Sequence, residues 1–359
     1  TEIYTLSLHD ALPILAAALS LLLGGCGPKP APSSDANYPA PVPKDGAKST
    51  APTGKKLKFA VVPKQKDNPV FAYAKTAAEK RAKEIGADLL WDAPPANDEA
   101  KQAEIVSTLA DQGVNGIAVS CSNPNTLKNA IDKAEAKGIP VICWDSDAPT
   151  SKRRAFYGID DEATGRLLGE EMARLLPSGG TVMVLSGVAG AQNLESRIKG
   201  AKEALAKAKG IKVLGVQYCK DDVTAAVQMI GDVMSKHPDL GGWLMVGGWP
   251  LFAKNGLDAI TPGKTKVVAV DPLPEAQKWI EDGRVQVCVG QKVFGWGSES
   301  INILAALAEG KPVPGIDAKG FVDSGVDIVV KEKTADYAAA KYVDLATYRK
   351  QFEAAAAGK

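Results

Sequence analysis

Short apolar runs alternate with amphipathic stretches from residue 57 onward. Within the stretch 70–85, Phe71, Ala74, Ala78 and Ala82 recur with the 3.6-residue period of an α-helix. This alternation is typical of βαβ units, whose parallel strands form a sheet with helices on both faces. In the first half of the chain the pattern predicts strands at 57–62, 87–91, 116–120, 140–144 and 155–158, and helices at about 70–85, 98–112 and 124–137.

The same alternation repeats in the second half, so we predict an α/β protein with two doubly wound, Rossmann-like lobes of parallel sheet. In such sheets ligands bind beyond the carboxyl ends of the strands. Two lobes that face one another would place a ligand in the cleft between them. The predicted strands are 180–185, 212–218, 242–246, 266–270 and 285–290, and the helices are near 161–175, 192–208, 223–236, 250–259 and 273–281.

An apolar run at 15–25 ends in Leu23-Gly24-Gly25-Cys26. It has the length of a secretory signal and is shorter than the about 20 residues of a transmembrane helix. We therefore expect residues 1–25 to be a signal peptide and Cys26 to be lipidated and anchored to a bacterial membrane. The alternative is a buried N-terminal helix with an incidental cysteine.

Two segments flank this signal. Residues 1–14 lack Lys and Arg and are interpreted as a sequencing-adapter translation, so they and His9 carry no further argument. Residues 26–56 are rich in Pro, Ala, Ser, Lys and Gly, a composition that cannot bury enough apolar surface to fold. We interpret them as a linker that follows the lipidated cysteine. Residues 57–359 exceed one ordinary domain in length.

Composition excludes several classes of protein. The formal net charge is +1, which favours neither nucleic acid nor an anionic membrane surface as a partner. His237 is the only histidine beyond the excluded segment, so we expect no metal site. The remaining cysteines lie in or beside apolar runs without CxxC spacing, which favours buried free thiols, although a disulfide between neighbouring strands stays open for the first two. They are Cys121, Cys143, Cys219 and Cys288.

Polar and aromatic residues follow the predicted strands. Fixed donors and acceptors beside flat apolar rings suit a sugar, whose hydroxyls donate and accept while its C–H faces stack on aromatics. In the first lobe these residues are Lys64, Asp67, Asn68 and Phe71 after the first strand, and Trp144, Asp145, Ser146 and Asp147 around the end of the fourth. In the second lobe they are Gln192, Asn193, Arg197, Asp221, Asp222, Trp249, Asp271 and Gln291.

Several of these residues have structural alternatives. Asn68 precedes Pro69 and can cap the next helix, and Asp147 can cap a loop. Arg197 can be a solvated helix charge. Trp144 and Trp249 can belong to the core, and Asp271 directly after a strand is destabilising unless it is paired.

No motif in the chain indicates catalysis. We find no nucleophile–base pair, and residues 187–190, Gly-Val-Ala-Gly, match neither GxGxxG nor the P-loop pattern. We therefore expect a protein that is not an enzyme and that uses no cofactor.

A set of motifs resembles the periplasmic monosaccharide-binding proteins of ABC importers, the ribose, glucose and galactose type of type I periplasmic binding protein. The resemblance covers about residues 57–330 and rests on the order and spacing of the motifs together. They are "DNPVF" at 67–71, "GVNGIAVSCSNP" at 113–124, "IPVICWDSDAP" at 139–149, "YGIDDEATGRLLGE" at 157–170, "NLESRIKGAKEAL" at 193–205, "HPDLGGW" at 237–243, "VVAVDPLPE" at 267–275, "VCVGQ" at 287–291 and "DSGVDIV" at 323–329.

The resemblance implies sugar contacts at particular positions. Three positions depart from the ribose pattern, since Ser146 replaces an arginine, Asp221 an aromatic residue and Gly247 an asparagine, while Trp249 can replace part of the lost contact. The "WDSD" segment and Lys64 are more like the branch that takes glucose, rhamnose or furanosyl signals, so a hexose is expected. The positions that match the family in type are Asn68, Phe71, Asp145, Arg197, Asp271 and Gln291; Lys64, Trp144, Asp147, Asn193 and Trp249 complete the predicted ligand-binding set.

The family also implies three crossings between the lobes, near Ile159, Lys292 and Val322. The first lobe would then contain 57–158 and 292–322, and the second 159–291 and 323–359. A sugar that contacts both lobes would shift an open–closed equilibrium. We expect a monomeric lipoprotein of the periplasm or cell surface that delivers its sugar to ABC permease subunits, with the lipid anchor as its only membrane contact.

Two alternatives use the same fold. A receptor that presents a sugar or furanosyl signal to a chemoreceptor or a sensor kinase is consistent with all these motifs. A transcription repressor would need a helix-turn-helix before the first lobe, where Cys26 and the Pro-rich linker stand instead.

Overall fold

The computed structural model describes residues 56–358. The predictions for the signal peptide, for lipidation at Cys26 and for nearly all of the linker lie outside these residues. No helix in the described range is long and apolar enough to cross a membrane.

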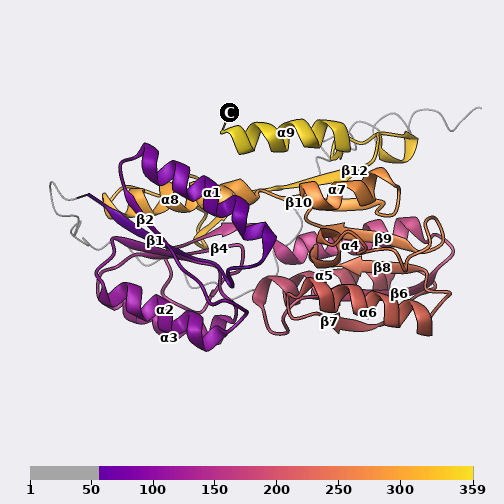
Figure 1. Cartoon of the computed structure of the whole chain (residues 1–359), viewed down its shortest axis with the longest axis horizontal. Coiled ribbons are helices and arrows are strands. Elements are labelled where there is room, and N and C mark those ends of the chain that lie inside the picture. Colours follow the sequence, from indigo (N-terminus) through magenta and orange to yellow (C-terminus); the bar gives the residue numbers. More distant parts are fainter. Residues whose placement is uncertain (1–55, 359) are drawn as a thin grey trace, which may run out of the picture. The chain divides into compact units, whose positions relative to one another are not determined.

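The described chain forms two sheets of mostly parallel strands, each covered by helices, which confirms the predicted two-lobe α/β fold (Figure 1). The first sheet has the order β11-β5-β4-β3-β1-β2, and the second has the order β13-β12-β10-β9-β8-β6-β7. The strands of the first sheet are β1 (Lys58–Val62), β2 (Asp88–Trp91), β3 (Gly116–Val119), β4 (Val141–Trp144), β5 (Ala155–Gly158) and β11 (Phe321–Asp323). Those of the second are β6 (Gly180–Ser186), β7 (Ile211–Tyr218), β8 (Gly242–Met245), β9 (Lys266–Val270), β10 (Val287–Gln291), β12 (Val326–Val330) and β13 (Tyr342–Asp344).

Helices cover both faces of each sheet. In the first lobe α2 packs against α3 and α1 packs against α8, and in the second α4 packs against α5 while α7 packs against the C-terminal α9. A separate apolar core lies between β1, β3 and β4 and the helices α2 and α3. The helices are α1 (Pro69–Glu84), α2 (Glu99–Asp111), α3 (Pro124–Ala136), α4 (Asp161–Leu175), α5 (Gln192–Lys207), α6 (Val223–Lys236), α7 (Pro274–Glu281), α8 (Val293–Ala308) and α9 (Leu345–Ala357).

The chain passes between the sheets three times. It leaves the first sheet after β5 and enters α4, returns after β10 to form α8 on the first lobe, and leaves again after β11 to form β12 of the second sheet. The last passage falls at Ser324 and Gly325, a little beyond the expected position, because Val322 still pairs with Tyr157 in the first sheet. β12 then joins β10 in antiparallel register.

One predicted helix is wrong. The stretch 250–259 forms only a 3-10 turn, η1 (Trp249–Phe252), followed by further turns. The chain turns back so tightly that a Cβ on Gly256 would lie 1.7 Å from the carbonyl oxygen of Pro250. The sequence pattern also did not predict α8 or α9.

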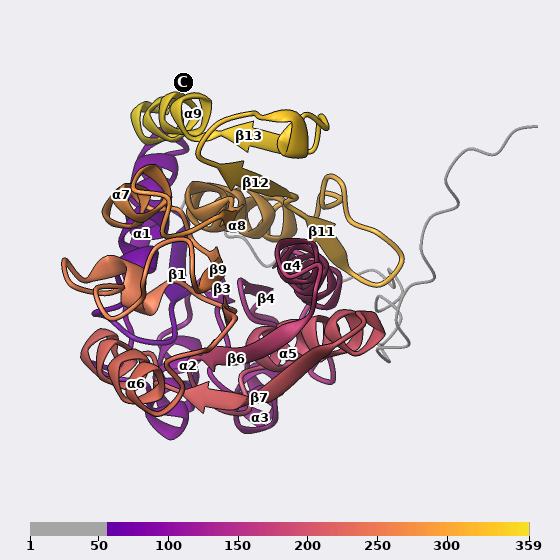
Figure 2. The same cartoon turned by 90° about the vertical axis from the view of Figure 1, so that its right-hand side faces the viewer.

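Helix α9 contacts both lobes (Figures 1 and 2). Its Arg349 bonds to Gln277 and Glu281 of α7 in the second lobe. Its Phe352 lies 5.1 Å between ring centroids from Tyr73 of α1 and 5.0 Å from Phe294 of α8, both in the first lobe. The C-terminal helix therefore joins the two lobes outside their three crossings.

Candidate functional site

A cavity lies where residues at the carboxyl ends of strands from both sheets meet. The space between the lining atoms, together with the open solvent at its mouth, is about 400 Å³. The first lobe contributes Lys64, Asn68, Val70, Phe71, Asp145 and Trp296, and the second contributes Asn193, Leu194, Arg197, Asp221, Gly247, Gly248, Trp249, Phe252, Asp271 and Gln291.

Polar contacts across this cavity centre on Asn193 of α5. The ammonium of Lys64, after β1, donates to Asn193 Oδ1 at 3.0 Å, and Asn193 Nδ2 donates to Asp145 Oδ1 at 3.2 Å. Lys64 also lies 3.5 Å from Asp145 Oδ2, which accepts a 2.7 Å bond from Ser120. A carboxylate, an ammonium and an amide from the two lobes thus form one buried group.

A second group of polar residues lies within the second lobe and centres on Arg197. Its guanidinium donates to Asp161 at 2.8 Å, to the carbonyl of Val246 at 3.0 Å and to Gln291 Oε1 at 2.8 Å. Gln291 Nε2 in turn donates to Asp271 Oδ1 at 2.8 Å. Since a guanidinium has five N–H donors, Arg197 keeps further donors for a ligand while its orientation is fixed.

Burial raises the pKa of each carboxyl in or beside the second-lobe wall. The pKa of Asp161 rises to about 7 because the group is desolvated, against the opposing effect of Arg197. Burial likewise raises the pKa of Asp271, opposed by Arg197, and that of Asp221, opposed by Lys64. The neighbouring residues of the wall therefore do not fully offset the cost of burying these carboxyls in their charged form.

Three of the cavity carboxylates come from residues with left-handed backbone. Asp145 has a φ of 59°, Asp221 of 60° and Asp271 of 70°, and the only other such non-glycine residue among those described is Lys220. Asp adopts this conformation more readily than most residues, but at a cost that structures retain mainly at turns and functional sites. Each turn follows a strand end and directs the chain away from the sheet toward the cavity.

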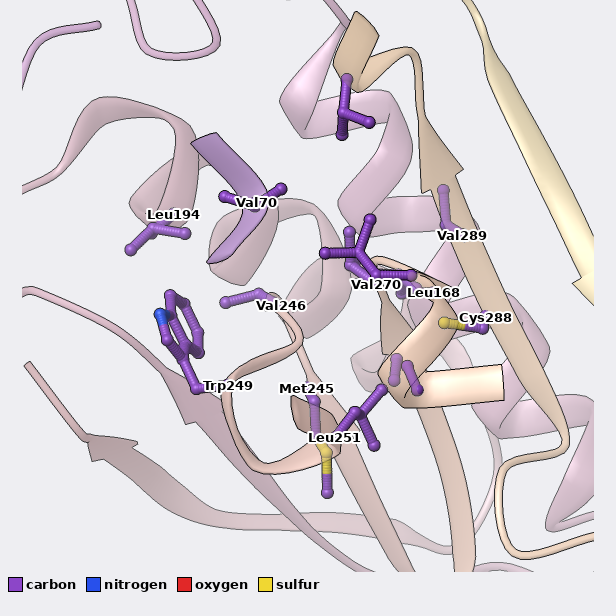
Figure 3. Packing of buried hydrophobic residues seen from close by; sticks show 14 of the residues in the cluster. Val70, Leu168, Leu194, Met245, Val246, Trp249, Leu251, Val270, Cys288 and Val289 are labelled. Carbon is purple, nitrogen blue, oxygen red and sulfur yellow. The ribbon is translucent and has the colours of Figure 1, made fainter. Parts of the chain in front are cut away.

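Aromatic rings line the rest of the cavity. In the first lobe Phe71 meets Trp144 edge to face at a centroid distance of 5.5 Å, and Trp296 lies 6.3 Å from Phe71. In the second lobe Trp249 and Leu194 line the cavity and belong to the large apolar cluster that contains the strands of the sheet (Figure 3). Fixed polar groups and flat apolar faces are therefore present together.

The structure brings most of the predicted site residues to this cavity. Asn68 both lines it and caps α1, since its Oδ1 accepts from Val70 N at 3.2 Å. The residues that line the cavity are Lys64, Asn68, Phe71, Asp145, Asn193, Arg197, Trp249, Asp271 and Gln291.

Two predicted residues do not line the cavity. Trp144 is fully buried, and its ring centroid lies 5.5 Å from that of Phe71 and 5.8 Å from that of Trp296. Asp147 turns to Arg153, which donates to its two carboxylate oxygens at 2.6 and 2.7 Å. A position at or shortly after the end of the fourth strand was the signal for both residues, and it does not show that Trp144 points into the core or that Asp147 already has a charged partner.

The chain matches the family model described as periplasmic binding protein domain over residues 59–312. The protein belongs to the periplasmic binding protein family. A solved structure of an ABC transporter solute-binding protein from Burkholderia graminis, in complex with D-arabinose, is 31% identical with a TM-score of 0.71, over 77% of this chain and 96% of that one.

Other relatives of this periplasmic binding protein are also named for the sugars that they bind. The ribose import binding protein RbsB of Escherichia coli is 26% identical over 76% of this chain and 90% of its own length. The D-allose-binding periplasmic protein of the same species is 27% identical over 71% and 86%. A glucose-galactose binding protein from Geobacillus stearothermophilus shares the fold, with a TM-score of 0.71 at 24% identity over 78% of this chain and 99% of that one.

Sequence reasoning missed several wall residues of this periplasmic binding protein. Trp296 lies on α8, which the pattern did not predict, and Phe252 lies on the turn η1 that was predicted as a helix. Asp221 was noted as a polar residue after a strand and as a departure from the ribose pattern, but it was left out of the predicted ligand-binding set. Cys121 and Cys143 are buried free thiols whose sulfurs lie 3.7 Å apart, and no group of three or more potential metal ligands is present in the range 56–358.

Proposed function

We propose that this protein is an extracytoplasmic binding lipoprotein that captures a monosaccharide, a hexose above all, between its lobes and delivers it to an ABC importer. One observation carries the proposal, namely a cavity in which both lobes supply buried charged groups beside aromatic rings. Charged groups make strong hydrogen bonds to hydroxyls, and the rings accept the C–H face of a sugar.

The relatives support a transport role. The two Escherichia coli proteins are named for ribose import and for D-allose, and the Burkholderia graminis protein is an ABC transporter component with bound D-arabinose. Import proteins among the relatives favour delivery to a permease over the sensory role. Ser146, Asp221 and Gly247 depart from the ribose pattern and argue against ribose, and the preference for a hexose rests on the likeness of the "WDSD" segment and Lys64 to the branch that takes glucose, rhamnose or furanosyl signals. The extracytoplasmic location rests on the family, and anchoring rests on Leu23-Gly24-Gly25-Cys26.

The experiment is a thermal-shift panel on the purified protein with glucose, galactose, xylose, ribose, rhamnose, fucose, arabinose and myo-inositol, and with amino acids as controls. A ligand at about 100 times its dissociation constant adds about 2.7 kcal/mol of stability. We expect one or a few sugars to shift the unfolding midpoint. A shift with amino acids and with no sugar would contradict the proposal.

Asp271→Asn tests the site within this panel. Asn tolerates the left-handed backbone of Asp271, so the change removes the charge without the backbone strain that Ala would add. Loss of a charged hydrogen bond should weaken sugar binding about 10- to 100-fold. Asp282→Asn is the control, because Asp282 is exposed and pairs with Lys278 on the surface. Equal affinities in the two variants would remove Asp271 from the site.

A further inference from the structure

Asp221 is the carboxylate of the cavity that was left out of the predicted ligand-binding set. It lies between β7 and α6 in the second lobe, lines the cavity and is 8% exposed. Its φ of 60° places the side chain on a tight turn after the strand. No family resemblance accounts for it, since an aromatic residue stands at this position in ribose binders.

The two carboxylate oxygens of Asp221 have different surroundings. Oδ2 accepts from Nδ2 of Asn97 in the first lobe at 3.4 Å, and the backbone carbonyl of Asp221 accepts from Gln65 of the same lobe at 3.5 Å. Oδ1 is buried and has no hydrogen-bond partner among residues 56–358. One oxygen therefore reaches across the lobes, and the other keeps an unused acceptor.

The unused oxygen lies beside the Trp249 ring. A Cβ added to Gly187 would lie 1.8 Å from Asp221 Oδ1 and 2.5 Å from Cζ2 of Trp249, so Gly187 leaves room for both groups at one end of the cavity. Leaving a buried acceptor unpaired costs about 1–3 kcal/mol, and more for a charged group. A ligand hydroxyl next to an apolar C–H face would satisfy this acceptor and cover the ring.

Lys64 does not already satisfy this oxygen. Its ammonium bonds to Asn193 at 3.0 Å and lies 3.5 Å from Asp145, and its effect on Asp221 is electrostatic. Burial raises the pKa of Asp221, against the opposing effects of Lys64, of the Asn97 side chain and of the backbone N–H of Val188.

We propose that Asp221 is a specificity-determining residue whose Oδ1 accepts a hydrogen bond from one hydroxyl of the bound monosaccharide, while Oδ2 holds Asn97 of the opposite lobe. This inference rests on the proposed function. It requires the ligand to carry a donor beside the face that covers Trp249, a requirement that an aromatic residue at this position would not impose.

Asp221→Asn tests the assignment because Asn keeps the size and the left-handed turn but removes the charge. Affinities are measured by calorimetry for sugar pairs that differ at one hydroxyl, namely D-galactose with D-fucose, D-glucose with 2-deoxy-D-glucose, and D-glucose with 6-deoxy-D-glucose. In the wild type one pair should show strong discrimination. In the variant the parent sugar of that pair should bind about 10- to 100-fold more weakly, and its deoxy partner should change little.

Asn97→Ala is the matched control, because it removes the interlobe bond and leaves Oδ1 in place. It should weaken the binding of every sugar by the same factor and preserve the discrimination between the two sugars of the pair. Gly187→Ala tests the same oxygen from the other side, since its methyl group would displace both Oδ1 and the Trp249 ring. It should weaken the binding of every sugar and, because Oδ1 moves, also reduce the discrimination within the pair. This variant keeps the test decisive if Asp221→Asn folds poorly.

The outcomes separate the two proposals. If Asp221→Asn and Gly187→Ala lose the same affinity for every sugar, as Asn97→Ala should, the role of Asp221 is overturned but sugar binding is not. The same holds if neither variant loses affinity. Absence of binding to every sugar by the wild type would overturn the proposed function itself.

Discussion

The two walls of the cavity are built differently. The second-lobe wall is a connected set of hydrogen bonds in which Arg197 joins Asp161, Gln291 and the Val246 carbonyl, and Gln291 joins Asp271. The first-lobe wall combines two packed rings, Phe71 and Trp296, with the polar side chains of Lys64, Asn68 and Asp145. The polar groups of the second-lobe wall therefore orient one another, whereas Lys64 and Asp145 of the first lobe bond to an amide of the second lobe, Asn193.

The hydrogen-bond network and the aromatic rings therefore contribute to sugar recognition in different ways. Hydrogen bonds discriminate among sugars that differ at one hydroxyl, because an unpaired buried group is costly. Stacking on a ring depends on an apolar C–H face of the sugar, and every hexose has such a face. We expect changes in the hydrogen-bond network of the second lobe to alter which sugar binds, and changes in the rings of the first lobe to alter the affinity for all of them.

The largest expected effect comes from Arg197→Met, which removes the centre of the second-lobe wall. The charge of Asp161 and the acceptors of Gln291 and Val246 lose their partner, so we expect unfolding to become easier by about 3–5 kcal/mol and sugar binding to be lost. Urea unfolding and calorimetry measure the two effects. Lys199→Met on the same helix is the control, because Lys199 is exposed and its ion pair with Glu162 is worth about 1 kcal/mol or less. Similar stability losses in both variants would contradict a central role for Arg197.

A smaller effect is expected from Phe71→Leu, which keeps an apolar side chain but removes a ring. The pairings of Phe71 with Trp144 and Trp296 are lost, each worth about 0.5–1.5 kcal/mol beyond the buried area. Affinity should fall by a similar factor for every sugar that binds, without a change in preference. Phe156→Leu makes the same change in the other core, where Phe156 stacks on Phe321, and should leave affinity unaltered. A changed order of sugar preference in Phe71→Leu would show that the first lobe also discriminates.

A further effect is a pH dependence that belongs to the second-lobe wall. The folded protein keeps the Asp161 proton up to a pKa of about 7, whereas the unfolded chain releases it near the ordinary value of 3.8. Because the folded state then binds more protons, the contribution of Asp161 to stability falls as the pH rises from about 4 to about 7. The free energy of unfolding should therefore decrease less between pH 5 and pH 8 in Asp161→Asn than in the wild type. Parallel pH profiles for the two proteins would remove Asp161 as the source.

The local pattern of apolar and polar residues was sufficient to predict most of the fold. The strands and helices from β1 to β9 follow the predicted alternation closely, apart from 250–259, because hydrophobic period is set by neighbours along the chain. The C-terminal part was harder to predict. The apolar helix α8 shows little contrast between its faces, and α9 is placed by Phe352 and Arg349, whose partners lie far away in the sequence.

The sequence by itself determined which residues stand at strand ends, and therefore most of the candidates for the cavity wall. Only the tertiary structure decided which of them meet. Trp144 ends the strand that Asp145 follows, and Asp147 lies two residues further on, yet Trp144 packs into the core and Asp147 pairs with Arg153. Asp221 enters the site because the first lobe places Asn97 against it. Sheet order and the approach of the lobes bring these groups together, and no local pattern in the chain encodes either one.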